Sequence, residues 1–159
     1  MFTRHQFPII KTSPSIGRMT ARISGDLDFT SQNSGFAYDH YTTDNKLHLS
    51  LNTVQLTTDA NRNEIERGIE IVFPPDISSG TYNFEDKKVC ATFWKIWQVE
   101  THIRFETYSA DTGSITLSFD HDQELYKGSF QFKSAGAEGK ELEVNGGMFS
   151  IKGRDSISL

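Results

Sequence analysis

The sequence predicts an all-β fold: a single-domain antiparallel β-sandwich of about nine to ten strands with a C-terminal meander. Apolar and polar residues alternate with a period of two in many short segments, and turn-forming residues separate these segments. No segment of helical length has the periodicity of an amphipathic helix. A lipocalin-like β-barrel is the alternative, because a barrel contains short strands at the same density.

The C-terminal meander is predicted between Gly113 and Gly153. Its turns, Asp120 to Glu124 and Ala135 to Lys140, are short enough to join antiparallel neighbours. Alternation places one set of apolar side chains on a single face of each strand. These core candidates are Ile115, Leu117, Phe119, Phe130, Phe132, Leu142, Val144, Phe149 and Ile151.

Residues 1–15 are expected to form an extended arm or edge strand, because proline is excluded from central strands, and residues 16–159 a single β domain. Arg18 to Phe29 alternates as one long strand, bent at Gly25. Lys46 to Thr57 is a clean strand, whereas Thr58 to Arg67 is polar with room for one helical turn.

Ile69 to Phe73 and Thr81 to Phe84 follow as short strands. Val89 to Thr107 is the longest apolar run, and large side chains occupy both faces of its strand from Phe93 to Val99. Such a strand is either covered on both sides or has one face that contacts a ligand or partner.

Composition limits the classes of function. The 159 residues have a formal net charge of -5 with acids and bases interleaved, which favours solubility and argues against general binding of nucleic acid or anionic membranes. The single cysteine, Cys90, cannot form an internal disulfide, and we expect it to be buried. The chain contains no signal-peptide pattern, so we expect either a cytoplasmic protein or an exported one without its leader, with no membrane insertion.

Four short motifs carry a family resemblance: Gly80-Thr81-Tyr82, then Gly113 to Leu117, Lys127 to Phe132, and Asn145 to Phe149. Their order resembles that in uncharacterised β-sandwich families of bacterial envelope proteins and lipoproteins, over about residues 47–151. The chain departs from the lipoprotein pattern because no lipidated cysteine lies near its start. The resemblance implies a fold and carries over no catalytic residue.

Motifs of catalysis and metal binding are weak. Asp111-Thr112-Gly113 matches the tripeptide of aspartic proteases, but it opens a strand and is expected to be a turn. Asp120, Asp122 and Glu124 lack the spacing of a calcium loop, and the five histidines lack zinc-site spacing. We therefore expect no catalytic residue, no metal and no cofactor.

The aromatic residues are the strongest candidates for a binding site. In an extended strand Phe93, Lys95 and Trp97 share one face, and Trp94 lies on the other. Because a lysine ammonium must reach water, the Lys95 face is expected nearer the surface, with Trp94 in the core. The predicted ligand- or partner-binding residues are Trp97, Phe93, Lys95 and Tyr108.

The leading hypothesis is a non-enzymatic β-sandwich module that recognises a protein or glycan. A lipocalin-like carrier of a small apolar ligand is the alternative, and a hydrolase that uses scattered carboxylates is a third. The sequence does not distinguish between monomer and oligomer.

Overall fold

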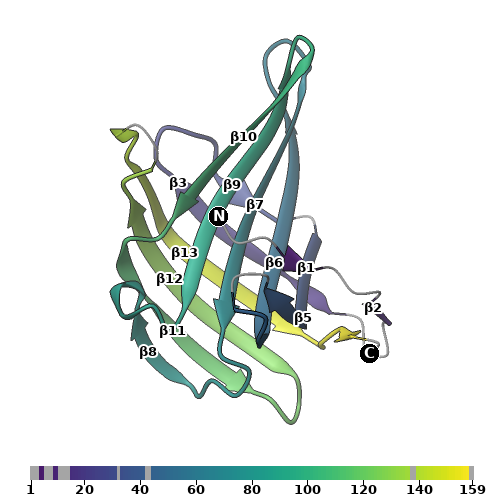
Figure 1. Cartoon of the computed structure of the whole chain (residues 1–159), viewed down its shortest axis with the longest axis vertical. Coiled ribbons are helices and arrows are strands. Elements are labelled where there is room, and N and C mark those ends of the chain that lie inside the picture. The colour runs from purple at the N-terminus through teal and green to yellow at the C-terminus, as the bar shows by residue number, and fades with distance from the viewer. Residues whose placement is uncertain are drawn as a thin grey trace.

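The computed structural model describes residues 4–5, 9–10, 15–31, 33–41, 44–136 and 139–157. Within these ranges the chain folds into two six-stranded antiparallel sheets and a separate two-stranded pair (Figure 1). The only helical element described is the short 3-10 turn η1 (Phe84–Asp86).

Sheet I has the strand order β1-β5-β6-β7-β9-β10, and sheet II has the order β4-β3-β13-β12-β11-β8. In sheet I the strands are β1 (Arg4–His5), β5 (Asn33–Tyr41), β6 (Leu47–Thr58), β7 (Glu64–Phe73), β9 (Cys90–Val99) and β10 (His102–Ser109). In sheet II they are β4 (Phe29–Thr30), β3 (Ile16–Ile23), β13 (Leu142–Lys152), β12 (Leu125–Ser134), β11 (Thr112–Asp120) and β8 (Gly80–Asn83). The separate pair is β2 (Ile9–Ile10) with β14 (Ser156–Ile157).

The prediction of an all-β antiparallel sandwich is confirmed. Ten of the described strands have four residues or more, and the other four have two. The barrel alternative is wrong, because the two six-stranded sheets are hydrogen-bonded as separate sheets. One isolated bridge, between Ala37 and Asp155, connects β5 to the segment after β13.

The meander is confirmed as β11, β12 and β13, paired in sequence order. Its alternating apolar residues form much of the core, and Phe130, Phe132 and Phe149 are all buried. The ladder between β12 and β13 shifts register at Phe130, where the Phe130 ring lies over Gly147. A Cβ atom at Gly147 would overlap that ring, so the close approach requires glycine.

The expectation of one long strand from Arg18 to Phe29 is wrong. The chain reverses at Gly25, which has a φ of 69°, and Phe29 pairs back onto Ala21. Period-two alternation continued across the turn, so the apolar pattern alone did not reveal it. The reversal places Asp26, Leu27 and Asp28 at one end of the sandwich.

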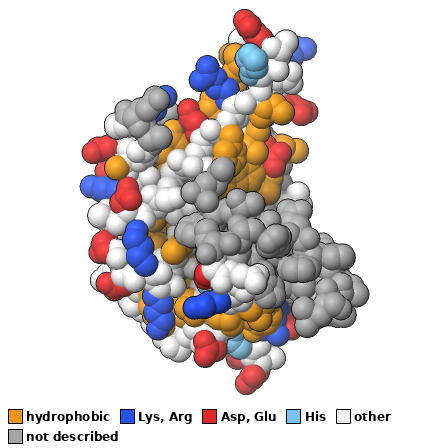
Figure 2. All heavy atoms as spheres, in the orientation of Figure 1, with side chains coloured by type: hydrophobic (Ala, Val, Ile, Leu, Met, Phe, Trp, Pro, Cys, Tyr) orange, Lys and Arg blue, Asp and Glu red, His pale blue; other side chains and the backbone are white. Residues whose placement is uncertain are grey.

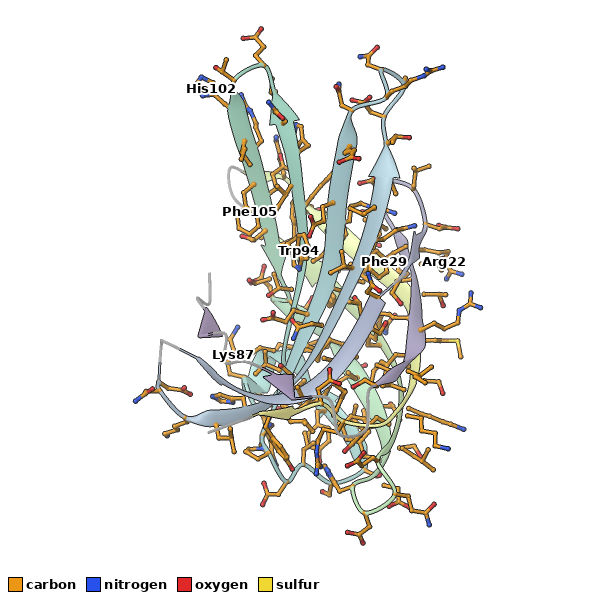
Figure 3. The ribbon with its side chains drawn as sticks, turned by 90° about the vertical axis from the view of Figure 1, so that its right-hand side faces the viewer. Arg22, Phe29, Lys87, Trp94, His102 and Phe105 are labelled. Carbon is orange, nitrogen blue, oxygen red and sulfur yellow. The ribbon has the colours of Figure 1, made fainter. Side chains whose placement is uncertain are left out.

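Two hairpins of sheet I extend beyond the rest of the molecule (Figures 1 and 3). In the β6–β7 hairpin the turn is organised by Asp59, whose carboxylate accepts hydrogen bonds from the N–H groups of Asn61 and Asn63. The helical turn expected between Thr58 and Arg67 is therefore replaced by this hairpin. In the β9–β10 hairpin the turn falls at Glu100, which has a φ of 53° and divides the long apolar run into two strands.

The N-terminal arm is described only in part. β1 pairs with β5 at the edge of sheet I, which agrees with the expected edge position. The rest of the predicted arm lies outside the described residues, apart from β2 and Ser15.

Candidate functional site

A row of polar side chains crosses the inner face of sheet I where the two hairpins leave the body. Gln55, Arg67, Lys95 and Glu106 are direct cross-strand neighbours on β6, β7, β9 and β10. We call these four residues the charged row. On the same face, Arg67 and Lys95 lie two residues nearer the hairpin turns than the buried residues Ile69 and Phe93. The charged row therefore forms the end of the core.

The β3–β4 turn supplies the partners of the charged row from the opposite sheet. Asp26 binds Lys95 with an Nζ to Oδ2 distance of 2.9 Å and lies 3.5 Å from Nη1 of Arg67. The Arg67 guanidinium also donates to the carbonyls of Leu27 and Asp28, at 2.8 Å each, and to Oε1 of Gln55 at 2.6 Å. The row therefore ties the two sheets together with charge-assisted hydrogen bonds.

Arg67 is only 1% exposed, and this burial is unusual for an arginine. Its Nε is the one buried side-chain nitrogen or oxygen without a hydrogen-bond partner in the part of the chain that the structure describes. Its hydrogen bonds to Leu27, Asp28 and Gln55 all come from the two Nη atoms, and Cζ of the guanidinium lies 5.8 Å from the centroid of the Phe29 ring.

The electrostatics of this network favour its charged form. Burial raises the pKa of Asp26, but hydrogen bonds from Lys95 and the Leu27 N–H, with the charges of Lys95 and Arg67, outweigh burial and lower the pKa below its ordinary value. The carboxylate therefore stays ionised at neutral pH and serves as an ion-pair partner. A carboxyl acting as a general acid or base would need a pKa shifted toward neutrality instead.

Two of the predicted binding residues lie in the core. Phe93 is 1% exposed and Tyr108 is 9% exposed, with their ring centroids 6.1 Å apart. Tyr108 donates to Oε2 of Glu106 at 2.8 Å. Burial, followed by the neighbouring Glu106, raises the pKa of Tyr108 to about 12. In this structure these two rings pack inside the sandwich.

The other two predicted residues, Lys95 and Trp97, share the inner face with them. Lys95 Nζ lies 5.7 Å from the centroid of the Trp97 ring, within the range of a cation–π contact. The structure therefore brings all four predicted residues to one face of β9 and β10. Trp97 is half-buried on the inner face of the extended hairpin.

The predicted facing of β9 is inverted. The face with Phe93, Lys95 and Trp97 was expected nearer the surface, but it points inward, and Trp94 lies on the outer face rather than in the core. The ion pair with Asp26 is the physical reason, because it gives the Lys95 ammonium a charged partner while the side chain is only 24% exposed. The Trp94 indole instead covers Gly68, where a Cβ atom would overlap it.

The outer face of the same hairpins carries an apolar surface. Leu56, Ile96 and Phe105 lie in one cross-strand row, with Glu66 between Leu56 and Ile96. We call the apolar residues of this face the outer strip: Val54, Leu56, Trp94, Ile96, Ile103 and Phe105. Three of them are strongly exposed: Leu56 at 54%, Phe105 at 46% and Ile103 at 77%.

Trp94 and Phe105 mark this face in Figure 3, and Figure 2 shows hydrophobic side chains gathered below the tip of the β9–β10 hairpin. Glu64 and Glu66 lie on this outer face, and the described cross-strand rows that contain the residues of the outer strip have no lysine or arginine. The outer strip is thus an exposed apolar surface with an acidic border.

The structure also shows the surroundings of the possible metal ligands, of the Cys90 thiol and of Asp111. No group of three or more His, Cys, Asp or Glu side chains is placed there to hold a metal ion. Burial raises the pKa of the Cys90 thiol, which is half-buried rather than fully buried as expected. Asp111 accepts a hydrogen bond from the Ala135 N–H at 2.7 Å, in agreement with its interpretation as a turn residue.

Comparison with protein-family models, with curated proteins and with solved structures gave no match. The resemblance to bacterial envelope families therefore stays a prediction. Among the described residues, no helix has the length and apolar character needed to cross a membrane.

Sequence reasoning missed both the charged row and the outer strip. Arg67 has the same parity as Ile69, Ile71 and Phe73, and this parity was a signal that it points inward. Ile103 and Phe105 share a parity in the run that was treated as one strand, so their common face could have been noticed. The turn at Glu100 has no glycine or proline to reveal it.

Proposed function

We propose that the protein is a non-enzymatic binding module that recognises a protein partner through the outer strip. The exposure of Leu56, Ile103 and Phe105 on one sheet face carries this proposal. Large apolar side chains exposed singly are ordinary, but several gathered on one sheet face are typical of a docking surface. Covering them would remove apolar area from water, which is the main driving force of protein association.

The chemistry of the outer strip favours a protein over a glycan. Sugar recognition needs donors and acceptors for hydroxyl groups, and Leu56, Ile103 and Phe105 have none on their side chains. The acidic border at Glu64 and Glu66 favours a partner with lysine or arginine beside its apolar residues. The expected partner is therefore a protein segment with apolar and basic side chains.

The alternatives of carrier and hydrolase have less support. The carrier hypothesis depended on a closed barrel, and the two sheets are separate. The hydrolase hypothesis needs carboxylates free to exchange protons, whereas Asp26 is paired with Lys95 and Arg67. These pairings support a structural role for the charged row.

A peptide library displayed on phage tests the proposal. We expect selection on the immobilised protein to enrich peptides with apolar and basic residues. The enriched peptides should lose affinity for a Leu56→Ser, Phe105→Ser double variant. The matched control is Ile16→Ser with Met148→Ser, which removes side chains that are 74% and 63% exposed on sheet II. Equal binding to both double variants, or enrichment of peptides without apolar residues, would contradict the proposal.

A further inference from the structure

β10 is the one long edge strand among the described strands. The sheet edges are β1 and β10 in sheet I, and β4 and β8 in sheet II. β10 has eight residues, whereas β1 and β4 have two each and β8 has four. Very short edge strands are a common protection against pairing with another chain, and β10 lacks this protection.

β10 also lacks two further protections. It contains no proline, and its ladder with β9 runs from His102 to Ser109 without a bulge. Figure 1 shows β10 at the margin of sheet I, with its upper part extended beyond the body. Its backbone groups on the free side are available to a further strand.

The register shows which residues present those groups. The two-residue turn makes Val99 and His102 the closing hydrogen-bonded pair of the hairpin. Hydrogen-bonded and non-hydrogen-bonded pairs then alternate, so the even-numbered residues of β10 bond to β9. Ile103, Phe105 and Thr107 therefore direct their N–H and C=O groups to the free edge.

We propose that β10 pairs antiparallel with β10 of a second copy of this chain, about a two-fold axis at Phe105. In this register Phe105 faces Phe105 of the other copy, and Ile103 faces Thr107. All three residues present free backbone groups, so the pairing forms about six hydrogen bonds between the chains. The two copies of sheet I then become one continuous sheet.

The side chains of β10 are self-complementary in this register. Arg104 of one copy lies opposite Glu106 of the other, on the inner face, and each such pair occurs twice because of the symmetry. Arg104 is exposed and has no ion-pair partner among the described residues. A charged edge usually discourages pairing, but opposite signs two residues apart attract a copy of themselves. This charge complementarity identifies the second copy as the occupant.

The pairing also involves the outer strip. The two Phe105 rings meet on the outer face, where aromatic cross-strand pairs add stability. The inference goes beyond the proposed function, because it rests on the free backbone and charges of β10 and not on the partner of the outer strip. Its failure would leave that function untouched.

Sedimentation velocity over a concentration series tests the pairing with charge reversals. The wild type should form a dimer as concentration rises. Arg104→Glu places two acidic residues opposite each other at both sites, and Glu106→Arg does the same with basic residues, so each variant alone should be monomeric. An equimolar mixture of the two variants restores both opposite-charge pairs, and we expect it to dimerise as the wild type does.

The double variant Arg104→Glu with Glu106→Arg should also dimerise, and circular dichroism of each variant checks its fold. A monomeric wild type at every concentration would overturn the inference. So would a wild-type dimer that both single variants retain, because a different surface would then form it. If Glu106→Arg unfolds through loss of its bond to Tyr108, Arg104→Glu compared with Arg104→Lys decides the question, because Arg104→Lys keeps Glu106 and the positive charge opposite it and should dimerise.

Discussion

Two neighbouring cross-strand rows on β6, β7, β9 and β10 differ in their environment: one is paired inside the chain, and the other is exposed to water. The charged row, with Arg67 and Lys95, points inward, and hydrogen bonds and ion pairs within the chain satisfy nearly all of its groups. The adjacent row, with Leu56 and Phe105, points outward and remains in contact with water. The charged residues are thus paired within the chain, whereas the exposed side chain of Phe105 keeps apolar area in water.

The largest expected effect comes from breaking the inner row. Arg67→Ala removes the hydrogen bonds to Leu27, Asp28 and Gln55, and it leaves Lys95 and the Leu27 N–H as the partners of Asp26. We expect a loss of about 3–5 kcal/mol in the free energy of unfolding, as for other broken buried pairs. Urea denaturation measures it, with exposed Arg18→Ala as the control, expected to stay within about 0.5 kcal/mol of wild type. A loss for Arg67→Ala as small as that of the control would contradict the structural role.

Substitutions in the hydrophobic core provide a reference for that loss of stability. Phe130 and Phe149 are each 4% exposed in the meander. Replacing either ring by alanine should destabilise the fold by about 3–5 kcal/mol, because it removes a buried ring and leaves a cavity. Thermal and urea unfolding of each variant provide the measurement. Unchanged melting temperatures would mean that the facing of the meander is wrong.

A smaller effect is expected on the outer face at Gly68. In Gly68→Ala the new methyl group must displace the Trp94 indole. We expect a loss of about 1–3 kcal/mol, the usual range for an inserted group that forces neighbours to shift. The intrinsic fluorescence of a Trp97→Phe background, which retains Trp94 alone, should also change. Identical emission spectra of Trp97→Phe with and without Gly68→Ala would show that Trp94 does not cover this glycine.

The smallest expected effect is the dependence of stability on pH. Because the pKa of Asp26 is lower in the folded than in the unfolded chain, its contribution is fully present above the ordinary value of 3.8. That contribution is lost as pH falls through the folded pKa. Asp26→Asn should therefore be less stable than wild type at neutral pH, with a difference that shrinks in acid. A difference that grows in acid would reverse the sign and contradict the ion-pair assignment.

Local patterns predicted the strands well and their partners poorly. The meander could be predicted because its alternation and its turns agree, so Phe130 and Phe149 point inward as expected. The face of β9 could not, because Lys95 is acceptable inside only when Asp26 lies opposite, and the reversal at Gly25 that brings Asp26 there left no break in the apolar pattern. Long-range ion pairs of this kind are set by the tertiary fold and not by any local window.

The proposed outer strip includes residues of the strand on which the binding site was predicted, but it lies on the opposite face. The four predicted residues do lie together, yet Phe93 and Tyr108 pack in the core. The outer strip was hidden because Leu56 and Phe105 are far apart in the chain and meet only through the register of β6, β7, β9 and β10. A single sequence does not specify that register.

Hydroxyl-radical footprinting with and without a library-selected peptide distinguishes the outer strip from the inner face as the binding surface. The oxidation rates of Phe105 and Leu56 report on the outer strip, and those of Trp97 and Tyr108 report on the inner face of the same strands. We expect the peptide to lower the oxidation rates of Phe105 and Leu56 and to leave those of Trp97 and Tyr108 unchanged. Protection of Trp97 with no change at Phe105 would contradict it and return the binding site to the inner face.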